Sequence, residues 1–268
     1  MSRPPITPVV LTWNEAANIE RTLSRLDWAP RVLVFDSGST DGTQELARRF
    51  ANVVVAERPF DSHAAQWEAA IRHPAVETDW VLALDADYVL TPELIEEIQG
   101  LDLSGPVRAF RASFRYCIEG MPLRGSLYPP VLLLYDRRVG HYVQDGHAMR
   151  FTTAEPVANL TGLVLHDDRK PFNRFLAAQR TYARLEAHKI RSTSWRDLGW
   201  SGRLRRLRWV VPPLVPIWLL LVKGLVFDGA AGWAYARQRW IAEWEISRAL
   251  KSGRRQTPGA SRTEGQIR

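Results

Sequence analysis

The chain has 268 residues, of which 46% are hydrophobic and 24% charged, and its formal net charge is +7. This composition excludes a fibrous, low-complexity or wholly disordered protein, and the length suits one large domain or a domain with an appendage. Its single cysteine, Cys117, excludes an internal disulfide, which fits a reducing compartment. The first ten residues, MSRPPITPVV, lack the apolar stretch of a secretory signal, so we expect none.

The charge is divided unequally along the chain. Residues 1–168 contain 15 Lys and Arg against 23 Asp and Glu, whereas residues 169–268 contain 21 against 6. This asymmetry predicts an acidic working domain followed by a basic segment that faces phosphate groups, either of nucleic acid or of anionic lipid.

Short apolar runs alternate with helical patterns over the first hundred residues. Patterns typical of strands and of helices take turns, with strands expected at 6–13, 31–37, 53–57 and 79–87 and helices at 15–26, 42–50, 62–73 and 91–101. This alternation predicts a parallel α/β sheet with right-handed crossovers. Thr91 followed by Pro92 predicts the N-cap and first residue of the last of these helices.

The later part of the chain has a different pattern of apolar residues. Residues 105–165 read as further strands that complete a mixed sheet, and residues 171–190 read as an amphipathic helix. We therefore expect a first domain over 1–170, a helical extension over 171–250 and a disordered tail over 251–268.

Polar clusters follow three of the predicted parallel strands. They begin at Thr12, Asp36 and Asp85, and the last is an Asp-X-Asp sequence that ends at Asp87. Because ligands bind outside the carboxyl ends of such strands, we expect these side chains at one edge of the sheet. Carboxylates placed together raise one another's pKa, and a divalent cation removes that conflict. The sequence therefore predicts that the pair Asp85 and Asp87 holds Mg²⁺ or Mn²⁺ together with a diphosphate.

Three segments in this order, VVLTWNEAANIERTLSRL, VLVFDSGSTDGTQELA and WVLALDADYVL, resemble the signatures of the inverting family 2 glycosyltransferases. The resemblance covers residues 6–100 well and 100–190 loosely. It implies the GT-A fold, a Rossmann-like mixed sheet, for residues 1–170 and a nucleotide-diphospho-sugar donor, by default a UDP-sugar. The segment ERPFDSHAAQWEAAI resembles the branch of lipopolysaccharide core transferases.

The resemblance also implies roles for individual residues. In the donor site, it implies that Thr12 and Glu15 contact the nucleotide and that Asp36 contacts the base. It implies that Asp85 contacts the ribose or the sugar and that Asp87 coordinates the metal. Arg58 and Gln66 are implied to line the donor pocket. Tyr88 stands where this branch usually has Glu, and Glu68 stands where it has Asn.

An inverting transfer needs a carboxylate that takes the proton of the acceptor hydroxyl. Related sequences carry His-Glu at this point, but here His147 is followed by Ala148, so Asp145 is the candidate base. His166 resembles a position that serves as a further metal or phosphate contact.

Each of these assignments has a structural alternative. Asp85 and Asp87 could form a helix cap at the end of a strand, Asp36 could form an Asx-turn, and Asp145 before Gly146 could be a turn residue. Glu15 could interact only with the dipole of a helix N-terminus.

Residues 209–222 form a continuous apolar run that contains three prolines. The run is shorter than the roughly 20 residues that span a bilayer. It follows four arginines, Arg203, Arg205, Arg206 and Arg208, and tryptophans lie nearby. This composition is typical of an anchor at the level of the lipid headgroups and predicts peripheral association with the inner, cytoplasmic face of a membrane. The alternative is a core helical hairpin, which the prolines disfavour.

The sequence therefore predicts a metal-dependent inverting glycosyltransferase with a lipid-linked or cell-envelope glycan acceptor. The alternatives are a catalytically impaired relative that binds nucleotide, a nucleotidyltransferase, and a basic nucleic-acid-binding protein that is not an enzyme. A nucleotidyltransferase normally has a Gly-rich basic loop near the first strand, which LTWNEAAN is not. Nucleic-acid binding is disfavoured because many aromatics of the basic part lie in or beside the apolar run.

Overall fold

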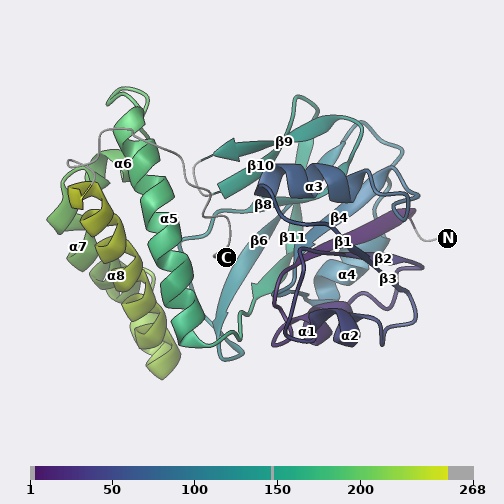
Figure 1. Ribbon diagram of the computed structural model, residues 1–268, viewed down its shortest axis with the longest axis horizontal. Coiled ribbons are helices and arrows are strands. Elements are labelled where there is room, and N and C mark those ends of the chain that lie inside the picture. Colours follow the sequence, from purple (N-terminus) through teal and green to yellow (C-terminus); the bar gives the residue numbers. More distant parts are fainter. Residues whose placement is uncertain (1–3, 146–147, 253–268) are drawn as a thin grey trace. The chain divides into compact units, whose positions relative to one another are not determined.

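The computed structural model describes residues 4–145 and 148–252. They form two compact units (Figure 1). Unit 1 comprises residues 4–122, 127–144 and 149–169, and unit 2 comprises residues 123–126, 145, 148 and 170–252. Most of the predicted tail over 251–268 lies outside the described residues.

Unit 1 is built on a mixed sheet of nine strands. Four parallel strands form one half, in the order β3 (Val53–Glu57), β2 (Val32–Asp36), β1 (Ile6–Thr12) and β4 (Trp80–Asp85). The other half continues with β8 (Val131–Asp136), β6 (Ala109–Ile118), β11 (Val157–His166) and β5 (Tyr88–Leu90), and β7 (Met121–Pro122) pairs with β6. The parallel half is the sheet that the alternation of strands and helices predicted.

Both faces of this sheet are covered, because its central strands are apolar at nearly every position. One face packs against three helices, α1 (Ile19–Leu23), α2 (Thr43–Ala47) and α4 (Pro92–Gln99). The other face packs against α3 (His63–Ile71) (Figure 1). A separate two-stranded sheet of β9 (Gly140–Asp145) and β10 (Ala148–Thr153) also contacts this second face, where Phe151 stacks on Tyr135 with ring centroids 3.8 Å apart.

The helices of unit 1 are shorter than the sequence predicted, and α1 differs most because it covers only 19–23 of the expected 15–26. The backbone N–H groups of residues 14–16 donate to side chains of Ser39, Thr43 and Asp41 and not to one another. Asn14 also has a φ of 55°, which ends any helical continuation. The N-cap prediction for α4 is confirmed, since Thr91 Oγ1 accepts from the Leu94 N–H at 3.3 Å.

Gly162 shows why α4 lies so close to β11. A Cβ atom at this position would be 2.5 Å from Leu94 Cα, a separation that real Cβ atoms do not show. The strand pairing of β11 with β6 is irregular between Asn159 and Leu163, which brings this glycine under the helix.

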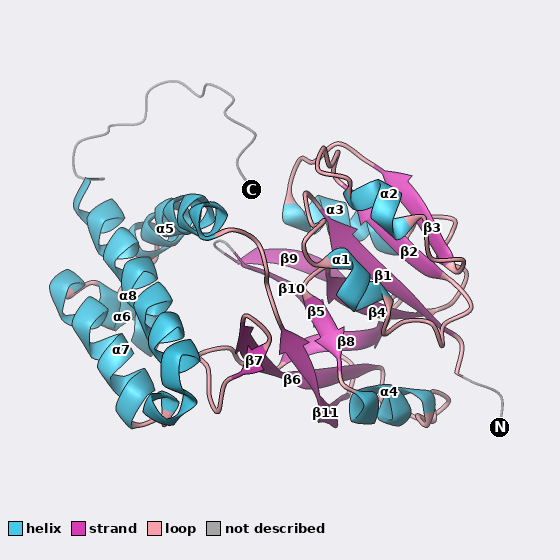
Figure 2. Cartoon of the chain, turned by 90° about the horizontal axis from the view of Figure 1, so that it is seen from below, coloured by secondary structure: helices cyan, strands magenta, loops and turns pink. Residues whose placement is uncertain are grey.

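Residues 170–252 of unit 2 form helices and turns (Figure 2). They are α5 (Phe172–Ser192), α6 (Trp200–Arg205), η1 (Arg208–Val210), α7 (Val211–Leu221), η2 (Leu225–Asp228) and α8 (Gly229–Ser252). The helix α8 packs against both α5 and α7. At Gly232 the backbone of α8 touches that of η2 so closely that a Cβ would lie 1.9 Å from the Leu225 carbonyl oxygen.

The prolines of the apolar run do not prevent a helix, contrary to the sequence argument. Pro212 and Pro213 fall in the first turn of α7, where no intrahelical N–H is required, and only Pro216 lies further inside. Among the described residues, no single helix is both long and apolar enough to cross a bilayer. The two segments 208–221 and 225–252 meet that test only as a pair, and they are bent by 73° relative to each other.

Three of the four arginines that precede α7 serve the fold of unit 2, which corrects their assignment to lipid headgroups. Arg205 is held by Glu243 in two hydrogen bonds of 2.6 and 2.8 Å and by Glu186 at 3.0 Å, and its side chain is 18% exposed. Arg203 and Arg206 donate to backbone carbonyls between residues 190 and 196. These contacts join α5, α6 and α8.

Candidate functional site

The three polar clusters that follow β1, β2 and β4 lie at one edge of the sheet. In the parallel register Thr12 is opposite Asp36, and Leu11, one residue earlier, is opposite Asp85. The strands therefore end side by side, and the carboxylates predicted to act together share the edge where α/β proteins bind their ligands.

Asp36 is fully buried and accepts five hydrogen bonds. Thr12 Oγ1 donates to its Oδ2 at 2.7 Å, which brings two predicted site residues into direct contact. Ser39 donates through both its hydroxyl and its N–H, and Gly38 N–H and Gln44 Nε2 donate to Oδ1. Asp36 thus holds the loop after β2 against the end of β1. Its contact with a nucleotide base stays a prediction.

Arg58 and Gln66, predicted to line the donor pocket, contact each other. Arg58 Nη1 donates to Gln66 Oε1 at 2.6 Å, and Gln66 Nε2 donates to Ser37 Oγ at 3.0 Å. Arg58 is also anchored through its backbone N–H, which donates to the Asp36 carbonyl. Its guanidinium donates to Asp61, and these hydrogen bonds lower the pKa of Asp61 to about 2.

Asn18 connects the first cluster to the end of β11. Its Nδ2 donates to Glu15 Oε2 at 2.7 Å and to Asp168 Oδ1 at 3.0 Å, and its Oδ1 accepts from Arg21 and from the N–H of Arg169. Asn18 is 1% exposed. Sequence reasoning assigned no role to Asn18 or Asp168, because no local pattern shows that they meet across 150 residues.

Asp87 and His166 form the centre of the site. His166 Nε2 lies 3.1 Å from Asp87 Oδ2, and the Asp167 N–H donates to the Asp87 carbonyl at 3.0 Å. Burial lowers the pKa of His166, but Asp87, Asp85 and Asp168 together raise it above its ordinary value. These three carboxylates therefore act on one imidazole, and two of them, Asp85 and Asp87, belong to the acidic cluster that the sequence predicted.

Four aromatic rings surround the imidazole of His166. Their centroids lie 4.8 to 6.1 Å from it, and the rings are Tyr88, Phe114, Tyr116 and Tyr128. Burial raises the pKa of Tyr88 well above its ordinary value, and its hydrogen bond with Asp85 adds to this effect. Tyr88 thus stays a neutral hydroxyl beside Asp85, at the position where the related branch usually has Glu.

A divalent cation needs several oxygen or nitrogen ligands. Among the side chains that the structure describes, no three of His, Cys, Asp or Glu lie close enough to hold a metal by themselves. Asp87 and His166 could supply one oxygen and one nitrogen ligand. Two protein ligands fit Mg²⁺ or Mn²⁺ where diphosphate oxygens and water complete the coordination.

The candidate base cannot be placed from the structure. Asp145 is the last residue of β9, but its side chain lies outside the described part of the chain, as does the whole of His147. The roles of both stay predictions.

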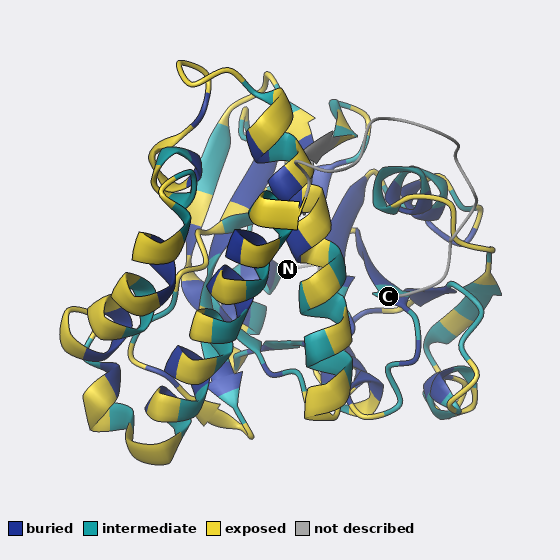
Figure 3. Cartoon of the chain, turned by 60° about the vertical axis from the view of Figure 1, so that its left-hand side comes forward, coloured by how far each residue is buried: buried dark blue, intermediate teal, exposed yellow. Residues whose placement is uncertain are grey.

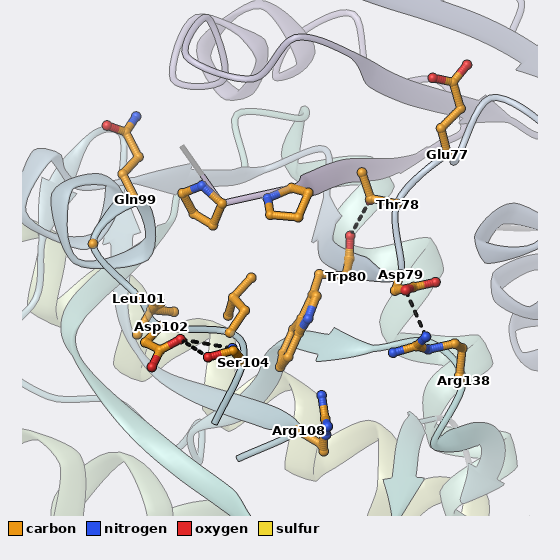
Figure 4. Close-up of a pocket in the computed structure, with 14 residues that line it drawn as sticks. Glu77, Thr78, Asp79, Trp80, Gln99, Leu101, Asp102, Ser104, Arg108 and Arg138 are labelled. Atoms are coloured by element: carbon orange, nitrogen blue, oxygen red, sulfur yellow. Dashed lines mark hydrogen bonds and ion pairs between the residues drawn. The ribbon is translucent and has the colours of Figure 1, made fainter. Parts of the chain in front are cut away.

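A cavity of about 710 Å³ lies at the opposite edge of the sheet, where β1 and β4 begin (Figure 4). Trp80 forms one wall, and Arg138 in a second wall is paired with Asp79 at 2.8 Å. None of the predicted site residues lines this cavity. It therefore belongs to the other end of the parallel strands.

Comparisons with known proteins support the family. Residues 8–138 match the model of Glycosyl transferase family 2. An uncharacterized glycosyltransferase of Rickettsia bellii is 37% identical over 95 residues, which cover 35% of this chain and 31% of the relative. A second, of Rickettsia felis, is 34% identical over 95 residues, which cover 35% and 32%. The match thus spans about a third of the length of these curated relatives.

Solved structures of S. aureus TarS are also similar. The 1–349 fragment has 13% identity and a TM-score of 0.47 over 98% of this chain and 96% of that chain. The fragment in complex with UDP-GlcNAc has 14% identity and a TM-score of 0.49 over 92% of each chain.

The matched segment contains the ends of β1, β2, β3 and β4 with all their predicted donor-site residues, but not Asp145 or His166. The predicted α/β fold class of the GT-A type with C-terminal helices is confirmed, whereas the lipopolysaccharide core branch stays a prediction. Residues 8–138, just under half of the chain, are thus similar to glycosyl transferase family 2.

Proposed function

We propose that this chain is a metal-dependent, inverting glycosyltransferase. It transfers a sugar from a nucleotide-diphospho-sugar, by default a UDP-sugar, to a lipid-linked or cell-envelope glycan acceptor. The observation that carries this proposal is the position of Thr12, Asp36, Asp85 and Asp87 at one sheet edge within the segment that matches the family.

The donor lies across the ends of β2, β1 and β4 in this proposal. The loop held by Asp36 and the pair of Arg58 and Gln66 border the nucleotide, because both are anchored at the ends of β2 and β3. Asp85 and Asp87 lie further along the same edge and take the ribose and the diphosphate. The Arg58 guanidinium supplies positive charge at the nucleotide side, although Asp61 shares it.

Asp87 and His166 are the residues that would hold a divalent cation. Such an ion, when bound, neutralises the charge that develops on the leaving diphosphate. The aromatic rings around His166 restrict its movement and keep Nε2 directed at Asp87. The protein therefore presents this pair in a fixed geometry before the donor binds.

The proposed reaction is a direct displacement at the anomeric carbon. The acceptor oxygen forms the new glycosidic bond as the bond from the anomeric carbon to the diphosphate oxygen breaks. The proton of the acceptor hydroxyl goes to the carboxylate of Asp145, the nucleoside diphosphate leaves, and the configuration inverts. The assignment of Asp145 rests on the sequence, which has no Glu after His147.

We also propose that the protein associates peripherally with the inner face of the membrane. Support comes from residues 169–268, which contain 21 Lys and Arg against 6 Asp and Glu. A soluble donor and a lipid-linked acceptor meet at such an interface.

Ligand binding and reaction products test the proposal. UDP-, GDP-, dTDP- and ADP-sugars are screened by thermal shift with and without Mn²⁺. We expect one nucleotide class to raise the melting temperature in the presence of Mn²⁺. Asp87→Asn should lose this shift, whereas the matched control Glu93→Gln, an exposed residue of α4, should keep it. No stabilisation by any nucleotide would overturn the proposal, and release of pyrophosphate in place of a nucleoside diphosphate would indicate a nucleotidyltransferase.

A further inference from the structure

Unit 2 exposes many large apolar side chains. Figure 3 shows the many exposed residues of its helices in yellow. On α7 they recur at helical spacing, so that they form one stripe of Leu214, Ile217, Trp218, Leu221 and Val222. Leu221 is 70% exposed. In η2, Val226 and Phe227 are also exposed. A helix whose outward face is apolar needs an apolar partner.

The outward stripe of α8 combines tryptophan with arginine. At intervals of three or four residues it presents Trp233, Arg237, Trp240, Trp244 and Arg248. Trp244 packs against Trp240 and against Trp209 of η1, with ring centroids 5.8 and 5.2 Å apart. On the α7 side, Lys223 Nζ lies 5.0 Å from the centroid of Trp218. Each set of indole rings is thus accompanied by a cation.

An apolar groove of about 340 Å³ lies between these two helices. It is lined by residues of both, namely Pro216, Leu220, Trp233, Ala236, Arg237 and Trp240. Arg237 is its one charged lining residue. The groove therefore has the form of a slot for a hydrocarbon chain with a cation at its border.

We propose that the exposed residues of α7, η2 and α8, which we name the docking face, bind an anionic phospholipid bilayer. The groove between α7 and α8 takes one hydrocarbon chain, and Lys223 and Arg237 contact phosphate groups. This inference deepens the membrane association of the proposed function by naming the surface, but it does not depend on the donor or on the metal.

Charge favours a bilayer over a protein partner or a second copy. The three acidic residues between 207 and 252 are all ion-paired, since Asp228 pairs with Arg124, Glu243 with Arg205, and Glu245 with Arg248. Lys223 and Arg237 are exposed. Two copies joined through this face would bring like charges together, whereas anionic lipids complement them.

The geometry of the helices favours lying on the bilayer. α7 has 11 residues, and the 73° bend after it separates its apolar stripe from that of α8. Indole rings beside cations are the combination that proteins place at the level of the headgroups. Since Arg203, Arg205 and Arg206 serve the fold, we assign the headgroup contacts to Lys223 and Arg237 instead.

Vesicle flotation of the full chain tests the docking face. Vesicles of phosphatidylethanolamine with phosphatidylglycerol should carry the protein, and pure phosphatidylcholine vesicles should carry much less. The variant Trp233→Ala/Trp240→Ala should bind about tenfold more weakly because it loses two large exposed rings that would enter the bilayer. The matched control Trp195→Ala/Trp200→Ala removes two exposed tryptophans outside the docking face and should bind like the wild type. An equal loss in both variants would show that the face is wrongly assigned.

Two further experiments separate the contribution of charge to membrane binding from the depth of insertion into the bilayer. Arg237→Glu should weaken binding to anionic vesicles by about tenfold and leave binding to phosphatidylcholine unchanged. An environment-sensitive dye on Leu221→Cys should shift to the blue with vesicles, whereas the same dye on Val54→Cys of β3 should not. Because the native Cys117 is buried, labelling of the wild type gives the background signal of the dye. No blue shift at residue 221, or a dimer in light scattering that Trp233→Ala/Trp240→Ala abolishes, would overturn the proposal. Nucleotide binding measured on the same variants separates this failure from failure of the proposed function.

Discussion

His166 Nε2 lies 3.1 Å from Asp87 Oδ2, so a residue at the end of β11 is fixed to the Asp-X-Asp sequence that follows β4. The two are 79 residues apart in the chain. The centre of the site therefore combines residues from both halves of the sheet in unit 1.

This contact predicts that Asp87 and His166 act together on a metal-bound nucleotide. Asp87→Asn and His166→Asn should each abolish the Mn²⁺-dependent part of UDP binding, because each removes one of the two proposed protein ligands. Titration calorimetry with UDP and Mn²⁺ measures this effect. If the double variant binds UDP and Mn²⁺ as tightly as the wild type, the two residues hold no metal.

We predict that Asp36 contributes to the stability of the fold as well as to donor binding. Asp36→Asn removes the charge and one acceptor oxygen from a buried group that receives five hydrogen bonds. We expect the free energy of unfolding to fall by roughly 2–3 kcal/mol in urea titrations. Thr12→Val removes one of the donors and should cost only about 1 kcal/mol. An Asp36→Asn variant as stable as the wild type would show that the five bonds contribute little.

The parallel half of unit 1 could be predicted because its strands are apolar runs bounded by polar clusters. The observed β3 has the predicted bounds, β1 is one residue shorter at its end, and β2 and β4 are shorter by one or two residues at each end. The helix expected at 15–26 was too long because Asn14 and its neighbours favour contacts with the loop at 39–43, and no helical periodicity reveals such contacts.

The site could be predicted only in part. Motif order placed Thr12, Asp36, Asp85 and Asp87 at one edge, since parallel strands of one sheet end together. Asn18 was missed because a lone Asn in a helical pattern is commonplace and its partner Asp168 is distant in sequence. The structural use of Arg205 was missed for the same reason, since its partner Glu243 lies 38 residues further on.

Asn18 is therefore predicted to support the site without contacting the donor. Asn18→Ala leaves Glu15, Asp168 and the N–H of Arg169 without one partner each, and we expect a loss of about 2 kcal/mol in stability and weaker UDP binding. Asn52→Ala is the matched control, because the Asn52 amide likewise donates two hydrogen bonds, to the carbonyls of Leu26 and Ala29, but far from the sheet edge. It should reduce stability and leave UDP binding intact. Equal UDP binding by both variants would remove Asn18 from the site.

The thiol of Cys117 predicts a dependence of stability on alkaline pH. Burial raises its pKa to about 11, with a further contribution from Asp167. The unfolded chain therefore ionises first, so the stabilising contribution is complete below the ordinary thiol pKa and is lost as the pH rises towards 11. Between about pH 8.5 and 11, the free energy of unfolding of the wild type should fall by roughly 2 kcal/mol more than that of Cys117→Ala. If the free energies of unfolding of the two proteins fell in parallel over this pH range, the raised pKa of Cys117 would be contradicted.

Arg205 should be essential for the fold of unit 2, because it neutralises two buried carboxylates at once. Its guanidinium lies 2.6 Å from Glu243 and 3.0 Å from Glu186, and these residues join α6 to α8 and α5. Removing one member of a buried pair leaves an uncompensated charge, so Arg205→Ala should cost about 3–5 kcal/mol. Arg196→Ala, at an exposed position before α6, should cost less than about 0.5 kcal/mol. Denaturant titrations of the full chain measure both, and circular dichroism should show helix lost before the sheet in Arg205→Ala. A single transition of Arg205→Ala at the wild-type midpoint would mean that Arg205 contributes no more to stability than a solvated arginine. Arg205 could then contact lipid headgroups, as the sequence first suggested.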